Sequence, residues 1–385
     1  MLRTALSILP ALVLAGCSCN QDYAFPTLSD IVVDGDEAFG PWLSLDTAPG
    51  GDRLTLTYYD IEQGALGFAT GTPNEAGRVS WVHEQVDGYT GDDGLDRYDR
   101  GTYSSHAVAS DGTVWVAYKD NKNGGLYASQ RVGPHNWTEG ALVDLGEGLT
   151  PNAGTWASLD LDASGQPVIA HYDEGAKVLR VSRLGSEGWT TETAWQGADA
   201  TQVGDTGGTT IVDADTGEYS KLLIEDGVEY IAFYDRASGA LHLLEGTSGA
   251  YTHTVVDDEG DVGQWPSLWT DGTTLQIAYH DVGNQQLRMA TRTAGSWSTA
   301  VVDEGAYTGA DSELFVRDDN LAVVYFDGFN NDQKLATWNN GGWDLETTDG
   351  EGIAVGFHNE VAMANGRWFV ASYDHTNKAM RIQAL

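Results

Sequence analysis

The sequence has little cysteine and few basic residues, and each shortage excludes a class of protein. Its two cysteines are Cys17 and Cys19, so residues 20–385 have no internal disulfide and depend on packing and hydrogen bonds. The 20 Lys and Arg stand against 57 Asp and Glu, which gives a formal net charge of −37 at pH 7. This excess of negative charge repels nucleic-acid phosphates and anionic membrane surfaces. We therefore expect no nucleic-acid partner.

Known catalytic motifs are also missing. The sequence contains no His-Glu-x-x-His, no Gly-x-Ser-x-Gly and no phosphate-binding glycine-rich loop before a helix. Paired carboxylates, by contrast, are too frequent to identify a glycosidase. The sequence therefore favours a non-catalytic binding module and assigns no catalytic residue. Two alternatives stay open, a glycan-cleaving hydrolase or lyase and a structural scaffold for protein contacts.

The N-terminal segment has the layout of an export signal. Arg3 precedes an apolar run over residues 5–14, which is too short to span a membrane. The run ends Leu14-Ala15-Gly16-Cys17, which resembles the lipobox of bacterial lipoproteins. The resemblance implies a signal peptide over 1–16, a lipidated Cys17 and a tether over 17–27, with a lipid anchor in the outer membrane or at the cell surface. An ordinary secreted protein is the alternative.

One pattern occurs seven times along the rest of the chain. An apolar residue is followed four positions later by Asp, with the period-two alternation of a half-buried β-strand between them. The last four copies are 46 or 47 residues apart, which is the length of a propeller blade. The aspartates that end the seven copies are Asp60, Asp120, Asp173, Asp235, Asp281, Asp327 and Asp374.

Each copy predicts four antiparallel strands. A tight turn such as Asp271-Gly272 precedes the strand that ends in Asp, a third strand follows, and an aromatic residue such as Trp297 opens a fourth. Four antiparallel strands make one propeller blade. We therefore predict an all-β protein, a seven-bladed β-propeller over residues 28–385, with blades that begin near residues 40, 101, 154, 217, 263, 307 and 353.

The last copy lacks a fourth strand of its own. Residues 31–34 match the ends of fourth strands elsewhere, such as residues 301–303. We therefore predict that residues 28–36 form the outer strand of the seventh blade. Such a strand would close the ring and remove free sheet edges.

The repeats resemble those of bacterial extracellular propellers built from Pro-Ser-Leu, Ile-Ala-Tyr-x-Asp and a strand led by Trp. Residues 265–268 (Trp-Pro-Ser-Leu) and 277–281 (Ile-Ala-Tyr-His-Asp) carry the resemblance most fully. It implies a fold and an exported setting, since such propellers have many functions. The outline is also similar to sialidase propellers. Their Ser-x-Asp-x-Gly-x-Thr-Trp box and arginine trio are missing, so sialidase activity is not expected.

Carboxylates gather in loops that a propeller places on one face. The seven repeated aspartates are expected to cap backbone amides of the turns that follow them. Two other loops are candidates for Ca²⁺, which binds carboxylate and carbonyl oxygens. An exposed acidic insertion without metal is the alternative for both. The candidate calcium ligands are Asp213 and Asp215 in one loop, and Asp92, Asp93 and Asp96 in the other.

The start of each inner strand is expected to line the mouth of the central channel. Aromatic rings cover the apolar face of a pyranose while nearby oxygens bind its hydroxyls. We therefore predict a site for a glycan or protein ligand on the acidic, aromatic-lined face, with rings that wedge between blades as the alternative. Aligned repeats place Trp42, Ser105, Trp156, Tyr219, Trp265, Asp311 and His358 there, and the predicted ligand-binding residues are Trp42, Trp156, Tyr219, Trp265, His106, Asp311 and His358.

Overall fold

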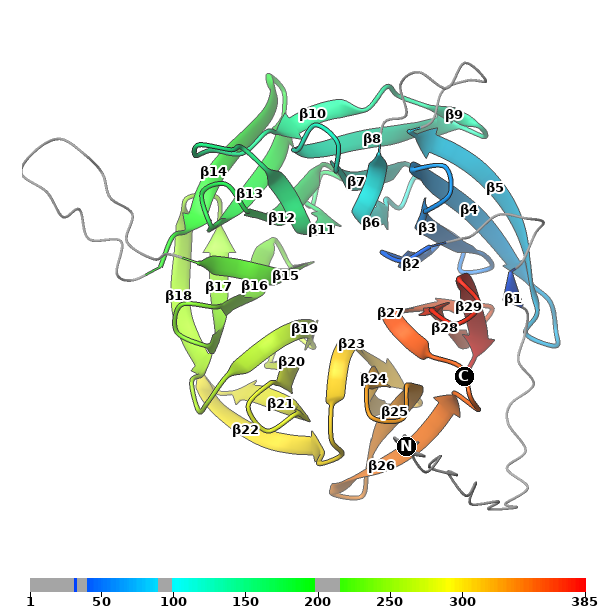
Figure 1. The fold of residues 1–385 in the computed structure, drawn as a ribbon, viewed down its shortest axis with the longest axis vertical. Helices are drawn as coiled ribbons and strands as arrows, with labels where there is room; N and C mark the ends of the chain where they lie inside the picture. The colour runs from blue at the N-terminus through cyan, green and yellow to red at the C-terminus, as the bar shows by residue number, and fades with distance from the viewer. Residues whose placement is uncertain (1–30, 33–39, 89–98, 198–214) are drawn as a thin grey trace, which may run out of the picture.

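The computed structural model describes residues 31–32, 40–88, 99–197 and 215–385. Their strands form seven antiparallel sheets that stand around a common axis (Figure 1). The predicted all-β, seven-bladed β-propeller is therefore confirmed. Within the described ranges, no helix is long and apolar enough to cross a membrane.

Each blade runs from an inner strand beside the axis to an outer strand at the rim. In the second blade the outer edge is split between β9 and β10, which both pair with β8. The first three blades contain β2 (Ser44–Thr47), β3 (Leu54–Asp60), β4 (Ala65–Pro73) and β5 (Val79–Asp87); β6 (Arg100–Val108), β7 (Val114–Asp120), β8 (Leu126–Gly133), β9 (Asn136–Trp137) and β10 (Ala141–Asp144); β11 (Ala153–Leu161), β12 (Pro167–Asp173), β13 (Val178–Gly185) and β14 (Gly188–Trp195). The next three contain β15 (Thr216–Glu225), β16 (Val228–Asp235), β17 (Ala240–Thr247) and β18 (Ala250–Asp257); β19 (Val262–Thr270), β20 (Thr274–Asp281), β21 (Gln286–Thr293) and β22 (Ser296–Asp303); β23 (Thr308–Arg317), β24 (Asn320–Asp327), β25 (Asp332–Asn339) and β26 (Gly342–Asp349).

The seventh blade lies next to the first and brings the two ends of the propeller together. It contains β27 (Val355–Ala364), β28 (Arg367–Asp374) and β29 (Ala379–Ala384), and the short β1 (Ile31–Val32) pairs with β29. Across the seam to blade one, Thr47 Oγ1 donates a hydrogen bond to the carbonyl oxygen of Met363 at 2.8 Å. The rest of the segment 28–36 lies outside the described residues, so closure by that outer strand stays a prediction.

Apolar side chains fill the spaces between successive blades. The second strand of a blade has neighbours on both faces, and every residue of β3 and β12 is buried. At the seam between blades one and seven, Leu56 and Tyr58 pack in one cluster with Phe369 and Ile382. This burial explains the apolar pattern of the repeated second strand.

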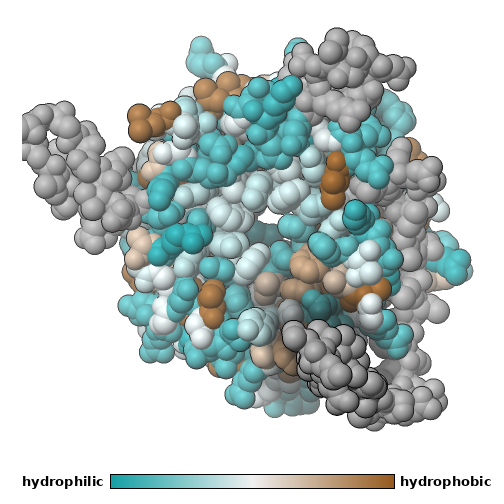
Figure 2. Space-filling model, viewed as in Figure 1, coloured by the Kyte–Doolittle hydropathy of each residue, from teal (hydrophilic) through white to brown (hydrophobic). Residues whose placement is uncertain are grey.

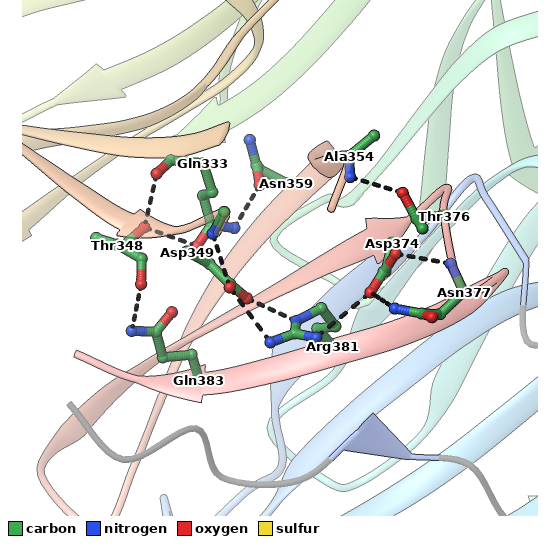
Figure 3. Close-up of polar contacts among 11 residues, drawn as sticks. Gln333, Thr348, Asp349, Ala354, Asn359, Asp374, Thr376, Asn377, Arg381 and Gln383 are labelled. Atoms are coloured by element: carbon green, nitrogen blue, oxygen red, sulfur yellow. Dashed lines mark hydrogen bonds and ion pairs between the residues drawn. The ribbon is translucent and has the colours of Figure 1, made fainter. Parts of the chain in front are cut away.

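A buried cation links neighbouring blades at the end of their strands. In blade seven, Arg381 donates to Asp349 at 2.6 Å, at the end of β26 in blade six, and to Asp374 at 3.3 Å, at the end of β28 (Figure 3). All three side chains are less than a tenth exposed. The equivalent pair of contacts is made in blades two, three, five and six by Arg100, Arg180, Arg288 and Lys334.

The repeated aspartates also cap the turns that follow them. Asp327 Oδ1 accepts the N–H groups of Phe329 at 3.0 Å and Asn330 at 3.1 Å, and Asp374 Oδ1 accepts that of Asn377 at 2.9 Å. The predicted capping role is confirmed. Since these aspartates are buried, they stabilise the blades and contribute little to an exposed acidic face. The same bonds are made by Asp60, Asp120, Asp173, Asp235 and Asp281.

Replacing Arg381 with Ala tests the contribution of the buried cation. The change leaves Asp349 and Asp374 buried without their shared partner, and breaking a buried ion pair from one side typically costs about 3–5 kcal/mol. We expect urea denaturation to show a loss of unfolding free energy of this size. The control is Arg367→Ala on the same blade, at an exposed arginine, with an expected change of less than about 0.5 kcal/mol. Equal losses in the two variants would contradict the role of Arg381.

Candidate functional site

A bulge in six of the seven inner strands gives one residue a left-handed backbone at the channel mouth, and Trp42, just before β2, has the same backbone. In β11 the pairing with β12 shifts register around Trp156, whose φ is 48°. Bulges of this kind redirect side chains and are frequent beside functional sites. A left-handed backbone is unusual for large side chains and costs about 1–3 kcal/mol at each position. The seven residues with this conformation, here called the mouth ring, are Trp42, Tyr103, Trp156, Tyr219, Trp265, Asp311 and His358, with φ between 48° and 58°.

In six blades, a glycine two residues earlier lets the inner strand pass close to the preceding blade. Gly263 has a φ of 111°, and a Cβ atom there would lie 2.7 Å from the Cα atom of Leu241. Only glycine tolerates both this backbone and this close approach. Similar close approaches to the preceding blade occur at Gly101, Gly154, Gly217, Gly309 and Gly356.

A glycine two residues before each member is a sequence feature that the mouth ring shares. Alignment of the repeats places Ser105 in blade two, whereas the structure places Tyr103 there, two residues after Gly101. Ser105 lies deeper in the channel, where its Oγ accepts the N–H of Leu159 at 2.9 Å. The predicted set therefore misses Tyr103.

Six of the seven neighbouring pairs in the mouth ring lie in contact. Each member is nevertheless only half-buried, so the rings pack together and also present surface to the channel. The separations between ring centroids are 5.3 Å for Trp42 and Tyr103, 5.9 Å for Tyr103 and Trp156, 4.7 Å for Trp156 and Tyr219, 4.7 Å for Tyr219 and Trp265, and 5.8 Å for Trp42 and His358, while His358 Nδ1 is 3.9 Å from Asp311 Oδ1.

The mouth ring surrounds a pocket of about 160 Å³. A hollow is visible on the propeller axis in Figure 2. Lys221, Glu313 and Glu360 also line the pocket and are here called the floor group; Lys221 Nζ lies 2.9 Å from Glu313 Oε2 and 3.9 Å from Glu360 Oε1. A cavity needs a volume of about 10–15 Å³, on the same measure, to hold one water. At about 160 Å³, this pocket therefore has room for a ligand of the size of a sugar ring.

Enclosure shifts the ionisation of the groups that line the pocket. Burial raises the pKa of Asp311 and of Glu360 above the usual range of carboxyl groups. Burial lowers the pKa of His358 against the opposing effect of Asp311, so the imidazole is neutral at neutral pH. Burial also disfavours the charge of Lys221, but Glu313 and Glu360 outweigh it and raise its pKa. The pocket therefore holds one firmly charged ammonium group.

The structure does not bring His106 into this pocket. His106 is 5% exposed, and its Nδ1 and Nε2 lie 3.0 Å from Ser44 Oγ and 2.9 Å from Thr55 Oγ1. Burial lowers the pKa of His106 to about 3. The side chain joins blades one and two, and its position is that of a packing residue.

One of the five calcium candidates, Asp215, lies in the described part of the chain. Asp92, Asp93, Asp96 and Asp213 fall outside the described residues. Asp215 accepts a hydrogen bond from Tyr172 Oη at 2.6 Å and lies 3.3 Å from Lys177 Nζ. In the described part of the chain, no group of three or more His, Cys, Asp and Glu side chains is placed to hold a metal ion. Calcium binding by these loops stays a prediction.

Comparison with known proteins supports the fold. No protein-family model and no curated protein matches the sequence. A variant of AofleA from Arthrobotrys oligospora aligns with a TM-score of 0.51 at 14% identity, over 82% of this chain and 88% of that one. The polysaccharide lyase Uly1 aligns with a TM-score of 0.51 at 10% identity, over 87% and 88% of the two chains. At such low identity the likeness shows the propeller fold alone.

The raised pKa of Glu360 predicts a pH-dependent stability. Above the ordinary value of 4.5, the folded protein keeps a proton that the unfolded chain has lost, so stability falls as pH rises from 4.5 through the folded-state pKa. Glu360→Gln should therefore raise the melting temperature at mildly alkaline pH by about 2 °C or more, with no gain at pH 4.5. Melting curves across this range give the measurement. Glu346→Gln, at an exposed glutamate, is the control, and parallel profiles for the two variants would contradict the prediction.

Proposed function

We propose that the protein is a non-catalytic, glycan-binding propeller whose site is the pocket inside the mouth ring. One observation carries the proposal: half-buried aromatic rings surround a pocket that is also lined by the floor group. Ring faces suit the C–H face of a pyranose, and the ammonium and carboxylate groups suit its hydroxyls. The aromatic members are Trp42, Tyr103, Trp156, Tyr219 and Trp265.

The backbone of the mouth ring supports this proposal. If the rings only filled the space between blades, they would not need a left-handed backbone, because side chains on an ordinary extended strand fill space without strain. Strained positions that the surrounding structure holds in place are typical of ligand-binding sites. Here the next blade holds the strained residue through its backbone: Ser220 Oγ donates to the carbonyl oxygen of Trp156 at 2.7 Å, and Ser312 Oγ to that of Trp265 at 2.8 Å. A site fixed in this way loses little entropy when it binds a ligand.

Removal of single ring faces tests the proposal. After a glycan array has identified a bound glycan, Trp42→Ala, Trp156→Ala and Trp265→Ala should each weaken its binding about tenfold, or about 1.4 kcal/mol, in calorimetric titrations. Trp338→Ala, at a tryptophan that is 42% exposed near the end of β25, should leave the affinity unchanged.

A second substitution separates binding from packing. Trp265→Leu keeps apolar bulk at the bulge but has no ring face. We expect this variant to fold and to bind weakly. A variant that binds as tightly as the original protein would show that the rings fill space only. Chromatography of the bound glycan after incubation should show no new product, and shortened or unsaturated chains would identify a hydrolase or lyase instead.

We also propose that the protein is exported and anchored in the cell envelope by lipid on Cys17, at the outer membrane or the cell surface. The export-signal layout of residues 1–16 and the lipobox-like sequence that ends at Cys17 support this. Such a location would expose the pocket to extracellular glycans.

The two cysteines provide a matched test of the anchor. Metabolic labelling with a fatty acid should mark the protein, Cys17→Ser should abolish the label, and Cys19→Ser should keep it. Membrane fractionation should release the Cys17→Ser protein from the envelope. Equal labelling of the two variants would exclude Cys17 as the lipidated residue.

A further inference from the structure

The pocket inside the mouth ring has more carboxylates than cations. Asp311, Glu313 and Glu360 line it together with Lys221. Burial raises the pKa of Glu360 to about 8, so this carboxyl keeps its proton at neutral pH, and Asp311 and Glu313 leave a surplus of one carboxylate over Lys221 (two against one). Among the described residues that line the pocket there is no arginine, and His358 is neutral at neutral pH because burial lowers its pKa. The charged lining is therefore suited to a cation more than to an anion.

The ammonium group of Lys221 contacts the two carboxyl groups of the floor group. Its Nζ lies 2.9 Å from Glu313 Oε2 and 3.9 Å from Glu360 Oε1, and Lys221 extends from β15 in blade four to carboxylates in blades six and seven. Asp311 occupies a different place, in the mouth ring itself. Its Oδ1 lies 3.9 Å from Nδ1 of the neutral His358, so this neighbour contributes no balancing charge.

The aromatic part of the mouth ring also attracts cations. The faces of Trp and Tyr rings carry negative electrostatic potential, and a cation within about 6 Å of a ring centroid is stabilised. The protein already uses this attraction beside the ring, where Lys119 Nζ lies 5.7 Å from the centroid of Tyr103. A cation inside the mouth ring would face aromatic rings on one side and Asp311 on the other.

We infer that the pocket selects glycans that carry a protonated amino group over their N-acetylated counterparts. The inference rests on the proposed function and names its ligand class, glycans built from free amino sugars. An ammonium group adds charge attraction to the stacking and hydroxyl contacts that any pyranose would make. Acetylation removes that charge and adds bulk in a pocket of about 160 Å³. The net charge of −37 would favour the approach of such a ligand from a distance.

A pair of matched oligosaccharides tests this inference. Calorimetric titration of the protein with the tetramer of glucosamine and with the tetramer of N-acetylglucosamine, at slightly acidic pH and low salt, compares a charged ligand with a neutral one. We expect the glucosamine tetramer to bind at least about tenfold more tightly. Because salt screens charges that water reaches, the ratio should fall at high salt.

One substitution assigns the preference to a residue. Asp311→Asn removes the charge but suits the left-handed backbone at this position, which Asn tolerates well. This variant should lose most of the preference for the glucosamine tetramer. The control is Asp318→Asn on the same blade, which makes the same change of charge at a φ of 50° on a side chain that is 90% exposed. Its preference should equal that of the original protein.

The outcomes separate this inference from the proposed function. Equal binding of the two tetramers, or tighter binding of the acetylated one, overturns the inference and leaves glycan binding in place. If the array identifies a neutral glycan and neither tetramer binds, the inference is likewise overturned and glycan binding stays in place. If Asp311→Asn keeps the full preference, Asp311 is not its source. If the array detects no glycan at all, the proposed function fails, and the inference fails with it.

Discussion

Contacts between neighbouring blades must hold the ring together, because the seven sheets share no strand ladder within the described ranges. Single backbone hydrogen bonds join some blades, such as that from Val262 N–H to the carbonyl oxygen of Gly239 at 3.0 Å, and side chains add further links. Near the axis, a serine on one inner strand accepts an N–H of the next: Ser158 Oγ that of Leu222 at 3.0 Å, and Ser267 Oγ that of Leu314 at 2.8 Å. Farther out, buried cations such as Arg381 connect five of the seven blades to the one before them. A domain without disulfides depends on such bonds, since each satisfies a buried polar group and fixes the angle between blades.

The candidate site lies where the inner strands depart from the residues that most of the repeats share. The position held by a bonding serine in blades one, two, three and five is held by Lys221, Glu313 and Glu360 in blades four, six and seven. Lys221 and Glu313 then form a contact between blades that are not neighbours, across the axis. In these three blades, the position that elsewhere links two inner strands instead supplies a charged side chain to the floor of the pocket. The mouth ring departs from its pattern in two of these blades, six and seven, where Asp311 and His358 take the place of Trp or Tyr.

The sequence predicts the fold well and the site only in part, for physical reasons. Alternating strands, tight turns and capping aspartates are local features, so their spacing is visible without contacts. Tyr103 was not predicted because the alignment of the repeats selects Ser105, two residues farther along β6, and takes no account of Gly101, which precedes the left-handed position by two residues. His106 was included for the related reason that neighbouring residues in a strand point to opposite faces. The buried cations were unpredictable because different strands supply them: Arg100 lies on inner strand β6, whereas Arg180 and Arg288 lie on third strands.

Blade four shows that the ring can form without a charged cation at every boundary between blades. His242 takes the position of the cation, and its Nε2 lies 3.8 Å from Asp235 Oδ2, but burial lowers its pKa to about 4, so the side chain is neutral at neutral pH. The seam to blade three keeps other links, including the contact of Arg183 with Glu229 at 2.6 Å. One type of bond between blades can therefore be lost where others remain. The same redundancy explains how the inner strands of blades four, six and seven exchange their serines for the charged residues of the floor group and still hold the ring.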